Sequence, residues 1–398
     1  MRTLNACLVA SFVFSTVARA QQVLVVGPGG YSLPQQAIDA AADGDIVLVK
    51  PGAATGATWT ISGKSLTLLG DIGTNPTLGP GWIQNISASQ HVTVRGIDVQ
   101  WFVKVQSDGP VWLEDMTLTA SLTGPLPTTD FPMLQLTNCA SVVVRGCAVY
   151  ATVANQPTPA AFLSTNSHAY VYSSSFHGAK GPEFNVGNPY LSHGAPGGQI
   201  EGGTLFASAS SFSGGAGGTF VGGGFDPTAL GGAGGPGLIN HGEVVFQGSG
   251  ASGGPGSYGP GGYGPNGPAF RGEVPSAIAW TTHVLTNSSP VREGQDVVFS
   301  FGGPAGERVG MYFSANPIPG IPEFGFGGVL VVDPLSAAPM FLGVLAPPGG
   351  LAVHFTAPNL PPAVMGSTVY AQSYFFDAAL TYVTIGPATA VTVLDSSL

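Results

Sequence analysis

The sequence predicts an all-β protein in which an elongated stack of β-coils is followed by a small antiparallel β-sandwich. Apolar residues eight positions apart recur around polar, turn-like stretches, and a similar short sequence motif follows each pair, as expected for stacked coils. Short strand-like runs separated by turn signals fill the last third of the chain. Charged residues make up only 8% of the chain, against about 25% in ordinary soluble domains. The sheet faces must therefore be built largely from Ser, Thr, Asn, Gln and Gly.

Residues 1–20 have the features of a secretory signal peptide rather than of the fold. Arg2 gives a positive start, an apolar run extends from Leu8 to Val17, and Ala18-Arg19-Ala20 resembles a cleavage site. The run is too short to span a bilayer, and no later stretch is long and apolar enough to do so. We therefore expect a protein that is secreted or held at the cell surface, without a transmembrane segment.

Removal of residues 1–20 leaves 9 basic and 21 acidic residues, a formal charge of −12. Nucleic acids and anionic membranes attract the opposite sign of charge, so we expect no nucleic-acid partner. The mature chain also keeps two cysteines, Cys139 and Cys147, on either side of the strand-like stretch SVVVR. An extended strand rises about 3.3 Å per residue, which places the two thiols beyond disulfide reach. Free, buried thiols are expected, and a disulfide would require the chain to double back between them.

Residues 21–61 predict a strand, a short helix and a second strand. Ser32 can cap a helix that has Pro34 in its first turn and runs through PQQAIDAAA, with Ile38 and Ala41 on one face near Ala37. The stretch IVLVKPG then returns as a strand. A helix at this place can cover the open end of a stacked sheet, whose unpaired edge would otherwise favour aggregation.

The stretch AIDAAADGDIVLVKPG, with the repeated strands that follow it, resembles the entry to right-handed parallel β-helices of the pectin-lyase-like superfamily. The resemblance covers roughly residues 22 to 272 and implies a right-handed parallel β-helix over residues 21–274. It says almost nothing about activity.

The coils can be aligned on their inward-facing residues. The apolar pairs are Ile86 with Val94, Val105 with Leu113, Leu136 with Val144, and Leu163 with Val171. One inward column is predicted to contain Leu68, Val94, Leu113, Val144, Val171, Ala207 and Phe246, which lie 19 to 39 residues apart. A second column, around the next corner, is predicted to contain Ile72, Val99, Leu118, Val149 and Phe176. Loops such as TGPLPTTDF and ANQPTPA take up the differences in coil length and should project from one side.

Arg95, Glu114 and Arg145 fall on equivalent outward positions of neighbouring coils. Stacking places equivalent residues about 4.8 Å apart, so these side chains form a column of alternating sign. The column has two interpretations: a structural charge ladder, which a sheet of this kind uses for modest stabilisation, or a site for an anionic ligand.

Residues 178–272 are rich in glycine, but two stretches, QIEGGTLFASASSF and LINHGEVVFQGSG, match the sequence pattern of the earlier coils. This region is interpreted as later coils with long glycine-rich loops; the alternative is a flexible linker. Residues 275–398 contain short strand-like runs separated by turns such as REGQD and PNLPP, which predicts a β-sandwich. This second part resembles C-terminal modules of secreted bacterial repeat proteins.

The familiar enzymes of the resembled superfamily have motifs that are missing here. Its lyases resemble one another in an acidic calcium cluster with a nearby Arg or Lys, but the acids of this chain are scattered: Asp98, Glu114, Asp115, Asp130 and Glu183. The polygalacturonase motifs Asn-Thr-Asp, Asp-Asp, Gly-His-Gly and Arg-Ile-Lys are absent, and so is a pectin-esterase motif. The sequence therefore predicts no metal and no cofactor.

Two sets of residues remain as weak candidates for a site. The titratable candidates of the glycine-rich coils are His177, Lys180, Glu183, His193, Glu201, His241 and Glu243. The three histidines could line one groove, although their spacing gives no signal of a metal site. The candidates for ligand binding are the tyrosines expected to point outward, Tyr150, Tyr170 and Tyr172, while Trp101 and Phe102 also lie on or beside coil strands. Outward aromatic rings in a row can stack on sugar rings.

These observations favour a non-catalytic secreted or cell-surface protein with a structural, adhesive or glycan-contacting role. Its expected partner is a polysaccharide or a cell-envelope glycan. The alternative is a divergent polysaccharide lyase or glycoside hydrolase acting in a loop-lined groove, which would need acid-base partners that converge on one substrate.

Overall fold

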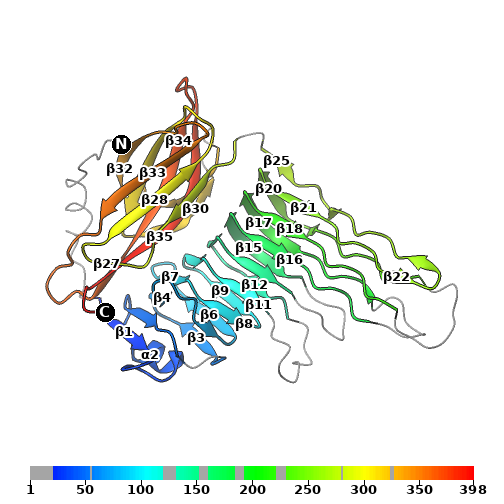
Figure 1. Ribbon diagram of the computed structural model, residues 1–398, viewed down its shortest axis with the longest axis horizontal. Helices are drawn as coiled ribbons and strands as arrows, with labels where there is room; N and C mark the ends of the chain where they lie inside the picture. The colour runs from blue at the N-terminus through cyan, green and yellow to red at the C-terminus, as the bar shows by residue number, and fades with distance from the viewer. Residues whose placement is uncertain are drawn as a thin grey trace.

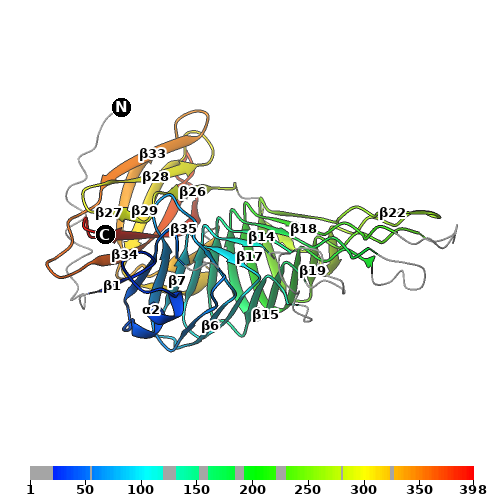
Figure 2. The same cartoon turned by 60° about the horizontal axis from the view of Figure 1, so that its bottom comes forward.

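The computed structural model describes residues 21–398 except 54–55, 120–130, 152–159, 184–191, 221–229, 279–280 and 323–326. The molecule is 52% strand and 2% helix. Parallel strands form the three walls of a β-helix: a 16-stranded sheet supplies two walls and a 7-stranded sheet the third. An antiparallel sandwich packs against one of these walls (Figures 1 and 2). The predicted all-β fold class is confirmed. The parallel pairing continues to Ala277, and the first strand of the sandwich begins at Val284.

Each wall of the β-helix collects one strand from every coil. The first wall contains β3 (Trp59–Ser62), β6 (Gly81–Ile86), β9 (Val103–Ser107), β12 (Leu134–Thr137), the first halves of β15 (Phe162–Tyr172) and β17 (Gly198–Ser208), β19 (Leu238–Asn240) and β24 (Phe270–Gly272). The second wall contains β1 (Val23–Val26), β2 (Ile46–Val49), β4 (Leu66–Gly70), β7 (Val92–Arg95), β10 (Val111–Glu114), β13 (Val142–Arg145), the second halves of β15 and β17, β20 (Glu243–Gln247) and β25 (Ser276–Ala277). The third wall contains β5 (Thr77–Leu78), β8 (Asp98–Gln100), β11 (Thr117–Thr119), β14 (Ala148–Tyr150), β16 (Ser175–His177), β18 (Ser211–Ser213) and β21 (Gly250–Ser252).

The predicted helix is α2 (Pro34–Ala40), and it lies across the first coils as expected. Its N-cap residue is Leu33 rather than Ser32; the Ser32 hydroxyl instead donates to the Gln36 side chain. Gln35 makes two hydrogen bonds to the backbone of edge strand β3: its Oε1 accepts from the Thr60 amide at 2.6 Å, and its Nε2 donates to the Thr60 carbonyl at 3.2 Å. This amide side chain therefore takes the place of a further strand at the exposed sheet edge.

The first inward column is confirmed in full, because Leu68, Val94, Leu113, Val144, Val171, Ala207 and Phe246 pair with one another in that order. The second column is correct except at its start. Leu78, not Ile72, pairs with Val99, and Ile72 is exposed. Two of the eight-residue pairs also differ by register: Ser164 rather than Leu163 lies opposite Leu136, and Ile83 rather than Ile86 lies opposite Val105.

The sequence motif that recurs after the second-wall strands lies at a corner of the coil. The residue at this corner has a positive φ in six successive coils: Gly96, Asp115, Gly146, Ser173, Ala209 and Gly248. The next residue turns inward, where a ladder of hydrogen bonds joins the coils. Ser174 Oγ accepts from the Cys147 amide at 3.1 Å, and Ser210 Oγ accepts from the Ser174 amide at 3.2 Å. A single left-handed residue followed by an inward one therefore explains the repeated motif. The inward residue is Ile97, Met116 or Cys147 in the earlier coils and Ser174 or Ser210 in the later ones.

Cys139 and Cys147 are free and buried, as expected, because each lies at a different corner of the same coil. Burial raises the pKa of the Cys147 thiol to about 12. Since the thiolate is the reactive form, we predict that Ellman's reagent modifies neither thiol in the native mature protein and both thiols after denaturation. Rapid modification of the native protein, or fewer than two thiols in the denatured chain, would contradict this expectation.

The sandwich has two main sheets and a small additional one. The first main sheet contains β26 (Val284–Asn287), β28 (Asp296–Gly302) and β33 (Gly350–Thr356). The second contains β27 (Val291–Arg292), β35 (Val383–Leu394), β34 (Gly366–Phe376), β29 (Arg308–Ser314) and β32 (Ala338–Val344), and the additional sheet pairs β30 (Pro317–Pro322) with β31 (Val329–Val332). Phe299, Phe301, Met311 and Phe375 fill the space between the main sheets.

The second wall is buried on both of its faces. Its outward side chains Trp112, Tyr172 and Phe206 form one apolar cluster with Val331 and Tyr370 of the sandwich. Accordingly β2, β7, β10 and β13 are buried at every position, whereas first-wall strands such as β3 and β12 alternate. The sandwich is therefore docked along the β-helix and covers most of the outer face of this wall.

The predicted column of Arg95, Glu114 and Arg145 exists, but it lies inside this interface rather than on the surface. Glu114 is fully buried, and its Oε2 forms salt bridges with the guanidinium groups of Arg95 at 2.9 Å and Arg145 at 3.4 Å. Its second carboxylate oxygen accepts from the backbone amide of Ala390 in the sandwich at 2.9 Å. Both guanidinium groups also donate to the side chain of Asn287. The arginines are engaged by the protein itself, which supports the structural interpretation over an anion site.

Candidate functional site at the glycine-rich end

The glycine-rich residues form ordered, extended segments that pack side by side beyond the coil strands (Figures 1 and 2). Backbone hydrogen bonds connect them, for example from the Gly215 amide to the Ala195 carbonyl and from the Gly235 amide to the Gly215 carbonyl, both at 2.8 Å. This supports the interpretation as extended coils over that of a flexible linker for the described residues. The segments lie at the end of the molecule opposite the sandwich.

Glycine recurs every third residue in these segments, at positions 178 and 181, 194 and 197, 214 and 217, 231, 234 and 237, and 253 and 256. Three residues per turn is the period of the polyproline II helix, and in collagen the same period places glycine where only hydrogen fits. An added Cβ at Gly194 would lie 1.9 Å from the Gly215 carbonyl oxygen, and one at Gly234 would lie 1.8 Å from that of Gly254. The glycines are thus required by the close approach of the backbones.

A short hairpin, β22 (Tyr258–Gly259) and β23 (Gly262–Tyr263), lies at the tip of this end (Figure 1). Pro260 and Gly261 form its turn, and Tyr258 pairs directly with Tyr263. The two rings have centroids 5.4 Å apart and planes at 68° to each other. The side chains are 56% and 73% exposed, and Leu230 beside them is 50% exposed. The tip therefore presents an aromatic pair to the solvent.

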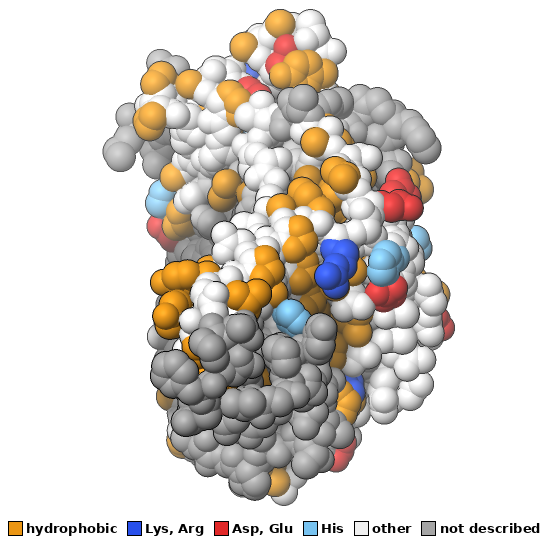
Figure 3. All heavy atoms as spheres, turned by 90° about the vertical axis from the view of Figure 1, so that its right-hand side faces the viewer, with side chains coloured by type: hydrophobic (Ala, Val, Ile, Leu, Met, Phe, Trp, Pro, Cys, Tyr) orange, Lys and Arg blue, Asp and Glu red, His pale blue; other side chains and the backbone are white. Residues whose placement is uncertain are grey.

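The pair lies in an uncharged stretch of the sequence. From residue 244 to residue 270 the sequence has no Asp, Glu, Lys, Arg or His. Figure 3 looks onto this end of the molecule, where hydrophobic side chains and uncharged atoms predominate and charged side chains are few. These tyrosines are not among the predicted ligand-binding residues, although YGPGGY, with a Pro-Gly turn between two tyrosines, has the pattern of a hairpin.

The tyrosines predicted to bind a ligand have different environments. Tyr170 and Tyr172 point out of the coil as expected, but the sandwich covers them and leaves them 5% and 1% exposed. Burial raises the pKa of Tyr170 to about 12 and that of Tyr172 further. Tyr150 remains 41% exposed and stacks on His177, with ring centroids 4.9 Å apart. Tyr150 is therefore the predicted ligand-binding tyrosine that keeps an accessible surface.

The predicted histidines do not share one groove. His177 is on the third wall, whereas His241 follows β19 at the corner between the first and second walls. His241 Nδ1 lies 3.0 Å from the Glu201 carboxylate, and hydrogen bonds from Gln199 and then from His241 lower the pKa of Glu201. His193 is an exposed residue of the glycine-rich segments, as is Glu183, while Lys180 is half-buried. These groups are spread over several faces of the molecule.

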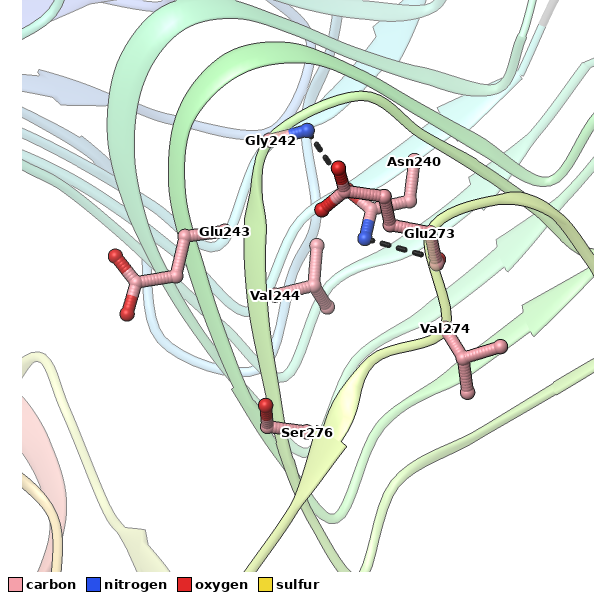
Figure 4. A pocket seen from close by; sticks show the side chains of 7 residues that line it. All are labelled: Asn240, Gly242, Glu243, Val244, Glu273, Val274 and Ser276. Atoms are coloured by element: carbon pink, nitrogen blue, oxygen red, sulfur yellow. Dashed lines mark hydrogen bonds between the residues drawn. The ribbon is translucent and has the colours of Figure 1, made fainter.

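An open hollow of about 230 Å³ lies near the last coil, lined by Asn240, Gly242, Glu243, Val244, Glu273, Val274 and Ser276 (Figure 4). Asn240 donates to the Glu273 carbonyl at 3.1 Å and accepts from the Gly242 amide at 3.0 Å, so its side chain holds the turn together. Glu243 extends away from Asn240 and Glu273. The two carboxylates that line the hollow do not converge as an acid-base pair would.

A second aromatic group lies on the first wall. Trp82, Phe102 and Phe131 form a row with ring centroids 5.2 Å apart at each step. The Lys104 ammonium lies 3.6 Å from the Phe131 centroid, and desolvation lowers its pKa. Phe102 of this row was among the aromatic residues predicted to lie on or beside coil strands. The Lys104 ammonium adds a cation–π contact to the row.

Among the described residues, no group of three or more His, Cys, Asp or Glu side chains is placed to hold a metal ion. Asp130 and most of the predicted loops TGPLPTTDF and ANQPTPA lie outside these residues. No helix in the described part of the chain is long and apolar enough to cross a membrane. Comparisons with family models, curated proteins and solved structures find no match to this chain.

Proposed function

We propose that this chain is an exported, non-catalytic protein with an adhesive or structural role, and that its glycine-rich end contacts glycans. The observation that carries the proposal is the tightly packed, glycine-rich projection of low charge that extends the parallel coils away from the sandwich. Such an end offers shape, backbone groups and aromatic rings to a partner. Its described residues do not bring together the titratable groups that glycan cleavage by acid-base chemistry uses.

The distribution of charge further supports a role in contact. The most elaborate charged cluster of the described residues, formed by Arg95, Glu114, Asp115 and Arg145, is used to dock the sandwich. The Glu201–His241 pair is exposed and isolated on a corner. A signal-like segment at residues 1–20 supports export.

A panel of neutral and acidic polysaccharides tests the proposal. We expect the purified mature protein to be retained on at least one of them without releasing reducing ends or unsaturated products. Product release that follows the protein through purification and is absent from a mock preparation would contradict the proposal in favour of a lyase or glycosidase. Retention on none of the polysaccharides would contradict the glycan-contacting role.

A further inference from the structure

We propose that Tyr258 and Tyr263 form a binding site for an uncharged sugar ring within a neutral polysaccharide chain. This inference rests on the proposed function and assigns to it a ligand class and two residues. It begins from the hairpin at the tip, where both side chains emerge on the same face because they are directly paired across the two strands.

The relative orientation of the two rings suits a flat ligand. Their planes are inclined at 68°, with centroids 5.4 Å apart, so the edge of one ring packs against a face of the other. The high exposure of both side chains leaves the opposite ring face accessible to a ligand. A pyranose ring has an apolar face of C–H groups and a rim of hydroxyls. The C–H face can stack on one tyrosine, while the hydroxyls meet the phenolic groups and the exposed backbone around them.

The support beneath the tyrosines limits the entropy that binding would cost. Tyrosine has only two rotatable side-chain bonds, and Tyr, Ser, Gly and Asn are also the residues that binding loops of antibodies favour. Here the hairpin adjoins hydrogen-bonded glycine segments: the Gly264 amide donates to the Ser257 carbonyl at 2.9 Å, and the Ser257 amide donates to that of Gly232 at 2.9 Å. The rings therefore emerge from a backbone that is already held in place.

The ligand class follows from charge and size. No side chain between residues 244 and 270 is charged, so this stretch has no cation of its own to neutralise an acidic polysaccharide or a phosphate. The exposed large apolar residues among the described part of 178–272 are Leu230, Tyr258 and Tyr263. A stable protein interface uses about 20–30 residues on each side, so a small ring is the better match to this surface.

The experiment measures retention of the full mature protein on cellulose, chitin and mannan as neutral probes, and on immobilised polygalacturonate and alginate as acidic ones. The variants are Tyr258→Ala, Tyr263→Ala, their double variant and the ring-preserving Tyr258→Phe/Tyr263→Phe. Tyr31→Ala is the matched control, because Tyr31 is also an exposed tyrosine but lies in the first coil of the β-helix, far from the hairpin. Tyr150→Ala tests the other exposed aromatic pair. Thermal unfolding confirms that each variant is folded.

We expect retention on a neutral probe that is insensitive to salt and is weakened about tenfold by each alanine variant. The double phenylalanine variant keeps both rings but loses the phenolic hydroxyls, so it should bind better than the double alanine variant. The Tyr31 and Tyr150 variants should bind like the wild type. Equal retention of the double alanine variant would overturn the assigned site and leave the proposed function intact. Preference for the acidic probes with strong salt dependence would overturn the ligand class. Retention of the wild type on none of the probes would overturn the proposed function together with this inference.

Discussion

Glu114→Gln is expected to destabilise the protein by about 3–5 kcal/mol, the usual cost of removing one partner from a buried ion pair. Glu114 is fully buried and is contacted by Arg95 and Arg145, each of which is 3% exposed. The substitution keeps the size of the side chain but leaves two guanidinium groups in the interface with Asp115 as their remaining acid. Because Asp115 is 40% exposed, it cannot replace a buried carboxylate.

Urea unfolding of the mature protein measures this loss, and Glu243→Gln is the matched control. Glu243 is an exposed residue of the same β-helix, so its substitution should change stability by less than about 0.5 kcal/mol. A second property separates a buried ladder from a surface one. Salt screens exposed pairs much more than buried pairs, so the effect of Glu114→Gln should persist in 0.5 M NaCl. An effect below about 1 kcal/mol that disappears in salt would show that the ladder behaves as a surface feature.

The interior of the coils could be predicted from sequence because stacked coils repeat the same inward positions. Leu113 and Val144 are inward because every coil must place an apolar residue at that position, and a shift of one residue would turn it outward. The errors occurred where strands continue through a corner. In β15, Leu163 was predicted to lie opposite Leu136 because it is apolar. The residue that lies there is its neighbour Ser164. Ile72 was chosen over Leu78 because the loop between the second and third walls is longer in that coil.

The docking of the sandwich was missed although the sequence contains a signal for it. Strands that are buried on both faces read as nearly continuous apolar runs rather than as alternating ones. The second-wall strands Val142–Arg145 and Ile46–Val49 have this composition, whereas Leu134–Thr137 alternates. The same signal places Tyr172 in an interface instead of on a ligand-binding face. What the repeat cannot supply is the identity of the covering element, because contacts such as Glu114 to Ala390 join residues 276 positions apart.

The site was predicted only as a region. The glycine-rich coils were predicted as loops around titratable residues such as His193 and His241. The three-residue period of glycine is present in the sequence, but it does not by itself distinguish a packed segment from a flexible linker. The order of these segments comes from contacts between backbones. The hairpin that carries Tyr258 and Tyr263 depends on that order for its position.

Gly215→Ala is therefore expected to disorder the glycine-rich end, while Gly250→Ala is expected to leave it intact. An added Cβ at Gly215 would lie 1.8 Å from the Ala179 carbonyl oxygen and 2.3 Å from its carbon, both of which belong to backbone that cannot move aside without breaking its hydrogen bonds. Overpacking of this kind costs roughly 1–3 kcal/mol or more. At Gly250 an added Cβ would meet nothing within 4 Å, and neither glycine has a positive φ, so the two substitutions differ in packing alone.

Hydrogen exchange measures the difference segment by segment. In Gly215→Ala, the amides of Gly235, Gly254 and Gly267, which donate in succession to Gly215, Gly235 and Gly254, should lose their protection. The amides of the first coils, around Val94 and Leu113, should keep it, because each coil contacts only its neighbours and the perturbation has no path along the whole stack. Gly250→Ala should exchange like the wild type throughout. If the wild-type amides of Gly235 and Gly254 exchange as fast as those of an unfolded chain, the glycine-rich segments are not packed in solution and the platform for the tip tyrosines does not exist.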